Sequence, residues 1–292
     1  MGNLGNAIAK AVKHSDEFNL VAIFSKRNIE GTVHFDKILE YSGKIDLLFL
    51  CGGSQNELEG QAEYLLPHFN IVESYDNHKR LKTHIEKLNI LAGRHRKLAF
   101  CSVGWDPGLF SLMRGLFDAL GYKPYSLWGK GTSQGHTQAI KQVPNVIDAI
   151  QFTLPNITAI EKIKRGESVD GGKRLHSREC YVVAEPVHQK EIEQQILTMP
   201  DYFEGYKTSV HFVNQKKLDS LKSFSHKGQV LTENNTLNFS LNLSSNPDFT
   251  ASVMVAFARA YSSLKIKKGY GAYTIFDMPF RYLLKQDKYF YL

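Results

Sequence analysis

Two aspartates in the first half of the chain follow strand-like apolar runs, where they could act on an amine. Asp76 lies in "NIVESYDNH" and Asp106 in "KLAFCSVGWDPG". If both runs are strands of one parallel sheet, their carboxyl ends meet at the same crevice. A carboxylate pair there could hold a substrate ammonium and steer its deprotonation. Taken alone, Asp106 would be explained by its Asp-Pro-Gly sequence, which is typical of a turn. The presence of two acids at neighbouring strand ends is what favours a functional role.

The first residues of the chain match the second half of a phosphate-binding loop. Gly2 and Gly5 in "GNLG" precede a helix-like segment, as do the last glycines of a G-x-G-x-x-G loop. Two glycines alone are weak evidence, and a chance Gly-x-x-Gly is the alternative. Ser25 follows 20 residues after Gly5, with Lys26 and Arg27, where an NAD enzyme would carry an acid. A hydroxyl and two cations suit a 2′-phosphate, so the sequence predicts NADP; two solvated charges are the alternative.

Other candidate groups lie in the second half of the chain. The glycine-rich stretch "WGKGTSQGH", from Trp128 to His136, could contact an anion through its backbone N–H groups, or could be a linker. Arg178 in a strand-like run could clamp a carboxylate, or could form a surface ion pair. On composition alone, three isolated polar residues have a structural role by default: Thr153, His226 and Asn246.

The elements that would position these groups form an alternating pattern. Apolar strands are predicted in "NLVAIFS" (19–25), "KIDLLFLCGGS", "NIVESYDNH" and "KLAFCSVGWDPG", with helices near 58–66 and at 79–93, the latter ended by Gly93. This pattern is typical of a doubly wound parallel sheet of the Rossmann type, an α/β fold. Longer, mixed strands follow, so we expect a predominantly antiparallel α+β domain with helices on one side. The predicted division is 1–122 for the dinucleotide, 123–245 for substrate and dimer contact, and 246–292 returning to the first domain.

Composition narrows the class of protein. The 292 residues are 42% hydrophobic with a net charge of +7, and the basic residues are scattered rather than gathered on a helix. We therefore expect no nucleic-acid partner. No run of 18 apolar residues and no secretory signal is visible, so no membrane partner is expected. Cys51, Cys101 and Cys180 are far apart and have no zinc-site spacing, which predicts reduced thiols, a cytoplasmic location and no metal.

The motifs together resemble one family from Gly2 to about Tyr273. "GNLG", "IFSKR", "YDNH", "VGWDPG", "WGKGTSQGH", "RECYVVAE", "TMPDYFEGY", "SHKGQV" and "NPDFTAS" occur in the order expected of meso-diaminopimelate dehydrogenases. The resemblance implies NADP-dependent oxidative deamination of the D-centre of meso-2,6-diaminopimelate, giving L-2-amino-6-oxopimelate and ammonia. It also implies a homodimer formed through the second domain.

The resemblance also implies site residues. Those for the cofactor are Gly2, Asn3, Leu4, Gly5, Ser25, Lys26, Arg27, Cys51, Gly52, Gly53, Ser54, Ser74, Tyr75, Asp76, Val103, Gly104, Trp105, Asp106 and Pro107. Those for the substrate are Asp76, Asp106, Trp128, Gln134, Gly135, Thr153, Arg178, His226 and Asn246. Asp76 and Asp106 are the candidate catalytic acids, and Asp106 is expected to help take the amine proton.

One departure from the family pattern concerns the beginning of the sequence. The pattern usually has a strand and a first glycine before "GNLG", where this sequence has only Met1; the loop between Arg27 and Lys44 is also short. We therefore expect a mis-called start or a fragment, with abnormal pairing beside 19–25, Gly2 at a ragged terminus, poor solubility and weak NADPH binding. Two alternatives stay open: an NADP oxidoreductase with another substrate, such as a dihydrodipicolinate-reductase-like imine reductase, or an inactive dimerising remnant.

Overall fold

The computed structural model describes residues 2–54, 57–222, 225–267 and 269–292. The chain divides into two compact units. Unit 1 comprises Met1–Leu112 and Pro247–Leu292, and unit 2 comprises Met113–Asn246. The first boundary therefore falls within helix α4 (Leu109–Ala119) rather than at residue 122. Leu112 in the first turn of α4 packs against the core of unit 1, which explains the difference.

Unit 1 is built on the parallel sheet that the sequence predicts. Its strands are β3 (Leu47–Phe49), β4 (Asn70–Val72), β5 (Leu98–Phe100) and β13 (Gly271–Tyr273), in the order β13-β5-β4-β3. Successive residues of β5 and Cys101, which directly follows it, face opposite sides: Leu98 and Phe100 join one core, and Ala99 and Cys101 join the other. The sheet is therefore buried on both faces, which explains why its strands are almost wholly apolar.

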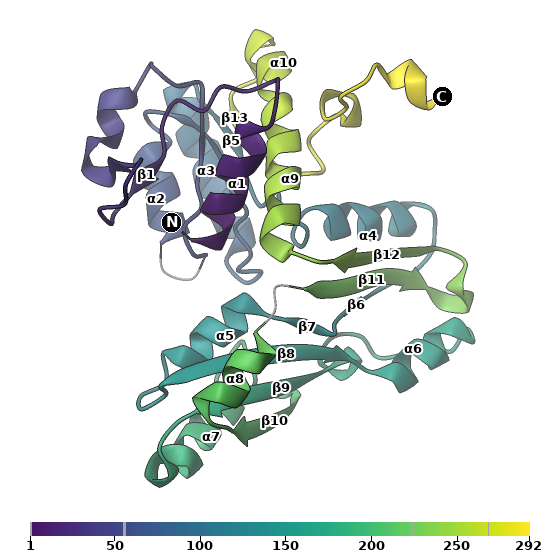
Figure 1. Ribbon diagram of the computed structural model, residues 1–292. Coiled ribbons are helices and arrows are strands. Elements are labelled where there is room, and N and C mark those ends of the chain that lie inside the picture. The colour runs from purple at the N-terminus through teal and green to yellow at the C-terminus, as the bar shows by residue number, and fades with distance from the viewer. Residues whose placement is uncertain (1, 55–56, 223–224, 268) are drawn as a thin grey trace. The chain divides into compact units, whose positions relative to one another are not determined.

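Helices cover both faces of this sheet. On one face lie α1 (Asn3–Lys13), α9 (Asn246–Arg259) and α10 (Tyr261–Ile266), and α1 runs beside α9 (Figure 1). On the other lie η1 (Phe35–Tyr41), α2 (Leu58–Leu65) and α3 (Leu81–His95). The predicted end of α3 at Gly93 is wrong. Ala92 is buried and the helix continues to His95, where Arg96 ends it with a φ of 53°.

The strand predicted over 19–25 is mostly absent, and what remains of it lies outside the main sheet of unit 1. Only β1 (Phe24–Ser25) forms a strand, and it pairs with β2 (Val33–His34) in a separate two-stranded parallel sheet. Gly2, which we expected at a ragged end, instead caps helix α1 in an extended conformation. Met1 lies outside the described residues.

Unit 2 contains two sheets. The first has the order β10-β9-β8-β7 and the second the order β12-β11-β6. Their strands are β6 (Pro124–Trp128), β7 (Gly131–Thr132), β8 (Asp148–Pro155), β9 (His176–Val183), β10 (Lys207–Phe212), β11 (His226–Thr232) and β12 (Asn238–Leu243). The pairing is antiparallel, as predicted, except between β9 and β10.

Helices lie on both faces of the first sheet of unit 2, which corrects the expectation of helices on one side. The helices that lie wholly within unit 2 are α5 (Gln134–Lys141), α6 (Ile157–Lys164), α7 (Gln189–Leu197) and α8 (Gln215–Leu221). Ala149 of β8 packs with α5 and α7, whereas the next residue, Ile150, packs with Leu218 of α8. Alternation along β8 thus fills two cores. Short 3-10 turns complete the chain: η2 (Gly172–Leu175), η3 (Pro186–His188), η4 (Glu233–Asn235), η5 (Phe280–Tyr282) and η6 (Lys288–Tyr291).

Within the described ranges, none of the helices has the length and apolar character that a membrane span needs.

Candidate active site

The glycines of "GNLG" lie at the start of α1. Gly2 is the N-cap, its C=O accepts from the Asn6 N–H at 3.1 Å, and Leu4 and Gly5 lie in the first turn. The first N–H groups of a helix have no intrahelical partner and carry partial positive charge. The first turn of α1 contains no acid to neutralise that charge. This end of α1 therefore fits a phosphate group.

The cationic residues after β1 are held differently from one another. Ser25 Oγ accepts from the Arg27 N–H at 3.0 Å, which fixes the bend of the chain. Lys26 Nζ lies 3.1 Å from Glu57 Oε1, and this hydrogen bond lowers the pKa of Glu57. Arg27 instead lines an open cavity of about 400 Å³ together with His34 and one acid, Glu30. Arg27 is thus better placed than Lys26 to receive an anion.

Three loops follow the carboxyl ends of β3, β4 and β5, and they carry the other predicted residues of unit 1: Cys51–Ser54, Ser74–Asp76 and Val103–Pro107. The first two loops are joined, because the Asp76 N–H donates to Ser54 Oγ at 3.3 Å. The third closes on itself, since the Gly104 N–H donates to the Pro107 C=O at 3.0 Å. Asp106 lies in this turn, one strand away from Asp76.

Gly108 is essential to the turn that carries Asp106. Its φ is +133°, and a Cβ there would lie 1.8 Å from the backbone oxygen of Gly104. No other residue fits, because both the conformation and the space exclude a side chain. The sequence "WDPG" therefore fixes where Asp106 is presented.

The protein environment changes several pKa values in these loops. Desolvation by neighbouring atoms raises the pKa of Asp76 even though the residue is exposed, and the Ser54 hydrogen bond opposes this shift. Burial and the nearby Glu59 raise the pKa of Tyr75 to about 12. Burial raises the pKa of Cys51 to about 12, so this thiol stays protonated at neutral pH. A raised Asp76 pKa suits a group that exchanges a proton.

Arg178 in unit 2 is a buried cation held by its neighbours. It is 8% exposed, its Nη1 donates to Thr153 Oγ1 at 2.7 Å, and its guanidinium lies 4.3 Å from the centre of the Tyr206 ring. Burial lowers its pKa, but an arginine remains charged at neutral pH. Its Nε is buried and has no hydrogen-bond partner among the described residues.

The register of the strands brings other predicted residues of unit 2 close to Arg178 and Thr153. Thr153 of β8 lies opposite Arg178 of β9 and opposite Gly131 of β7. A Cβ on Gly131 would lie 2.7 Å from His226 Cγ, so only glycine lets β7 approach His226 this closely. Trp128 donates its N–H to His176 Nε2 at 2.8 Å.

The remaining predicted residues lie at helix starts. Gln134 and Gly135 open α5, where Ser133 Oγ bonds His136 Nδ1 at 2.6 Å. Desolvation, followed by the positive charge of Arg178, lowers the pKa of His136 to about 3, so this imidazole is neutral at pH 7. Asn246 opens α9 shortly after Leu243, the strand partner of His226.

Four polar residues that no sequence motif revealed lie beside the predicted ones. Glu73 and His84 are buried next to the loop of Asp76, and Gln151 and Tyr206 lie beside Thr153 and Arg178. A detectable signal existed for Gln151, which lies between the apolar Ile150 and Phe152 of β8, whereas Glu73 lies directly after β4 and is followed by the polar Ser74. No metal-ligating cluster of three or more His, Cys, Asp or Glu side chains occurs in the part of the chain that the structure describes.

Comparison with known proteins gives consistent matches. A model of the diaminopimelic acid dehydrogenase C-terminal domain matches residues 104–245. The meso-diaminopimelate D-dehydrogenase of Ureibacillus thermosphaericus is 38% identical over 299 residues, which cover 96% of this chain and 92% of that protein.

Solved structures of related enzymes are also similar to this chain over almost its whole length. C. glutamicum DAP dehydrogenase in complex with DAP has a TM-score of 0.94 and 35% identity, covering 98% of this chain and 94% of that one. An engineered D-amino acid dehydrogenase bound to NADP⁺ has a TM-score of 0.90 and 34% identity, covering 99% and 95%.

Proposed function

Because the chain belongs to the meso-diaminopimelate D-dehydrogenase family, we propose how its residues carry out that reaction. The enzyme oxidises the D-centre of meso-2,6-diaminopimelate with NADP⁺ and water. The products are L-2-amino-6-oxopimelate, ammonium, NADPH and one proton. The reverse reaction is a reductive amination.

The observation that carries this proposal is the buried guanidinium of Arg178. A buried cation is costly unless it is paired, and here Thr153 and the Tyr206 ring supply no opposite charge. The Nε atom remains without a partner among the described residues. A carboxylate ligand would satisfy both needs, since arginine binds carboxylates through paired N–H groups. The substrate offers such a group on the carbon chain away from the reacting centre.

Unit 1 has the features that NADP requires. The N-terminus of α1 fits the pyrophosphate, with contacts from Gly2 to Gly5. Ser25 and Arg27, with Lys26, fit the 2′-phosphate. The remaining contacts come from the three strand-end loops, at Cys51–Ser54, Ser74–Asp76 and Val103–Pro107. When bound, the nicotinamide supplies the hydride acceptor.

The acids of unit 1 act on the reacting amine. Asp76 and Asp106 bind the ammonium of the D-centre as carboxylates, and one of them takes an amine proton before the hydride leaves. Water then adds to the resulting imine, and ammonium is released. The raised pKa of Asp76 fits either role, whereas Asp106 is better fixed by its closed turn.

Unit 2 binds the far end of the substrate. Arg178, Thr153 and His226 hold the far carboxylate, and Trp128, Gln134, Gly135 and Asn246 supply further contacts. The proposal includes a homodimer formed through unit 2. Support comes from β10 and β12, two edge strands that expose alternate residues. All three cysteines are free, which agrees with a reducing cytoplasm.

The function is tested by comparing stereoisomers. The purified chain is mixed with NADP⁺ or NAD⁺ and with meso- or LL-diaminopimelate, and nicotinamide reduction is followed. Only meso-diaminopimelate with NADP⁺ should react well, because the LL isomer has every functional group but no D-centre. Equal reaction of both isomers contradicts the proposal. Oxidation of another amino acid instead favours an oxidoreductase with another substrate, and no reaction together with no thermal shift by NADPH favours an inactive remnant.

A further inference from the structure

A second acid is buried where β4 ends, beside the loop of Asp76. The side chains of Glu73 and His84 are both 0% exposed. Glu73 still pairs as a strand residue, since its N–H donates to the Phe100 C=O at 2.9 Å and its C=O accepts from the Val103 N–H at 3.0 Å. A buried carboxylate is costly unless it is hydrogen-bonded. The hydrogen bonds of the Glu73 carboxylate therefore indicate what this buried acid does.

Two backbone N–H groups and the His84 ring contact the Glu73 carboxylate, and the buried Cys101 thiol also interacts with it. Oε1 accepts from the Ser102 N–H at 3.1 Å and lies 3.1 Å from His84 Nε2. Oε2 accepts from the Tyr75 N–H. The carboxylate oxygen accepts from His84 when the ring carries its hydrogen on Nε2. Glu73 thus joins the loop after β4 to the loop after β5.

His84 supports the same loop from helix α3. Its ring stacks on Tyr75 with centres 4.2 Å apart and an angle of 28° between the planes. The Tyr75 hydroxyl donates to Glu59 at 3.4 Å, and Arg80 forms a 3.0 Å ion pair with Glu59. Tyr75 is therefore fixed at its backbone, its ring and its hydroxyl, directly before Asp76.

The loop after β5 depends on Glu73 for an unusual backbone conformation. Ser102 has a φ of +57°, in the left-handed region that residues other than glycine rarely adopt. The N–H of Ser102 is bonded by Glu73 Oε1, which stabilises this conformation. The chain then enters the turn that presents Asp106. Backbone strain of this kind persists only where the surroundings enforce it, and it is common at functional sites.

We propose that Glu73 and His84 are a positioning pair that fixes the loops of Asp76 and Asp106 for reaction. This role rests on the proposed function, in which the two aspartates bind the reacting amine. Neither residue of the pair touches the substrate. Their effect passes through the backbone of Tyr75 and Ser102.

Three substitutions test the pair. Glu73→Gln keeps the shape, but its amide nitrogen must face one of the backbone N–H donors, so both loops cannot stay bonded. We expect kcat to fall by about thirty-fold or more, because small displacements of reacting groups cost about a hundred-fold. His84→Phe keeps the ring against Tyr75 but removes the donor, whereas His84→Gln keeps a donor and removes the ring. If the hydrogen bond matters most, His84→Gln retains the higher kcat.

The chain offers a matched control at the other end of the same strands. Asn70 Oδ1 accepts from the Leu98 N–H at 2.9 Å, and its Nδ2 donates to the Asp46 C=O at 2.8 Å. Asn70→Ala therefore removes a side-chain clamp from the amino end of β4 and β5. We expect it to lower the melting temperature while kcat stays within about two-fold of the unaltered enzyme.

Hydrogen exchange at the amides of Tyr75 and Ser102 completes the test. Exchange should accelerate in Glu73→Gln and not in Asn70→Ala. Unchanged exchange, or a Glu73→Gln enzyme that folds and keeps its kcat, overturns the proposal. If Glu73→Gln does not fold, equal kcat values for His84→Phe, His84→Gln and the unaltered enzyme overturn it. Failure of the unaltered chain to oxidise meso-diaminopimelate contradicts the proposed function instead, and the exchange comparison still decides the pair.

Discussion

In unit 1 the acids of the candidate site follow the carboxyl ends of strands, whereas in unit 2 the buried cation Arg178 lies within a strand. Glu73 is bonded by the backbone N–H groups of Tyr75 and Ser102, which loops leave available. Arg178 lies within β9, where the backbone is used by the sheet, so side chains of neighbouring elements must satisfy it.

This difference has a consequence for how each region depends on the rest of the fold. A strand-end group depends on local loop geometry, such as the turn closed by Gly108. A mid-strand group depends on register, since Thr153 reaches Arg178 only because the two lie opposite each other. A slip of one residue would move Thr153 to the other face of the sheet.

Loss of the Asp106 charge should have the largest effect. Asp106→Asn keeps the shape of the strand-end turn but cannot act as a base. We expect meso-diaminopimelate oxidation to fall by about a hundred-fold or more. NADPH binding, measured by fluorescence titration, should survive. Near-normal turnover would show that Asp106 serves only to form the turn, and Asp76 would then be the candidate base.

The cations after β1 should differ in their effect on cofactor choice. Arg27→Ala should weaken NADPH binding by about ten-fold and leave NADH binding almost unchanged, because a charged hydrogen bond to the 2′-phosphate is lost. Lys26→Ala is the matched control and should lose less, since Lys26 already pairs with Glu57. Equal weakening of NADPH and NADH by Arg27→Ala would contradict the 2′-phosphate contact.

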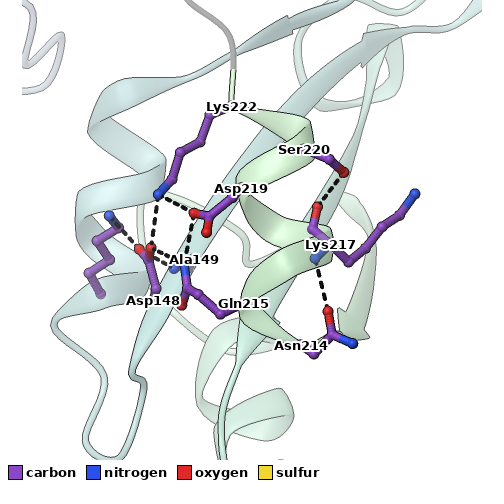
Figure 2. A network of polar contacts seen from close by, with 9 residues as sticks. Asp148, Ala149, Asn214, Gln215, Lys217, Asp219, Ser220 and Lys222 are labelled. Carbon is purple, nitrogen blue, oxygen red and sulfur yellow. Dashed lines mark hydrogen bonds and ion pairs between the residues drawn. The ribbon is translucent and has the colours of Figure 1, made fainter.

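The smallest effect concerns Asp148, at the start of the strand that carries Thr153. Figure 2 shows Asp148 within a network that includes Gln215, Asp219 and Lys222. Burial alone would raise the pKa of Asp148, but hydrogen bonds from Lys141, Gln215 and the Ala149 N–H together lower it to about 2.

Because this pKa is lowered in the folded state, the stabilisation is present above the unfolded value of about 3.9 and is lost as the pH falls towards about 2. Asp148→Asn should reduce the free energy of unfolding at pH 7 by about 1–2 kcal/mol, after allowance for solvent screening. Urea unfolding of both proteins at several pH values measures this. A difference that does not shrink below pH 4, or a changed KM for meso-diaminopimelate, would show that Asp148 acts in another way.

Much of unit 1 could be predicted from the sequence because its strands are buried on both faces. The runs that contain β3, β4 and β5 stand out as apolar, and Asp76 and Asp106 come directly after two of them. The end of α3 could not be predicted, since burial of Ala92 carries the helix past Gly93. Glu73 was overlooked because no local pattern reports which donors surround a buried acid.

The residues of unit 2 were harder to find. The strand runs were visible, but which residues lie opposite one another depends on pairing between distant segments. Thr153 lies opposite Arg178 of β9, and His226 lies against Gly131. Neither Thr153 nor His226 has a distinctive sequence context. Only family resemblance singled them out.

The proposed binding of the far carboxylate by Arg178 is tested most directly by removing that carboxylate from the substrate and Arg178 from the enzyme. D-lysine has the reacting centre and the far amine of meso-diaminopimelate but lacks the far carboxylate. The kcat/KM of each compound is measured for the unaltered enzyme and for Arg178→Met. Loss of a charged hydrogen-bonding group should lower kcat/KM for meso-diaminopimelate by about thirty-fold, mainly through KM, and leave D-lysine within about three-fold. An equal fall for both compounds would contradict the account, since Arg178 would then not bind the far carboxylate.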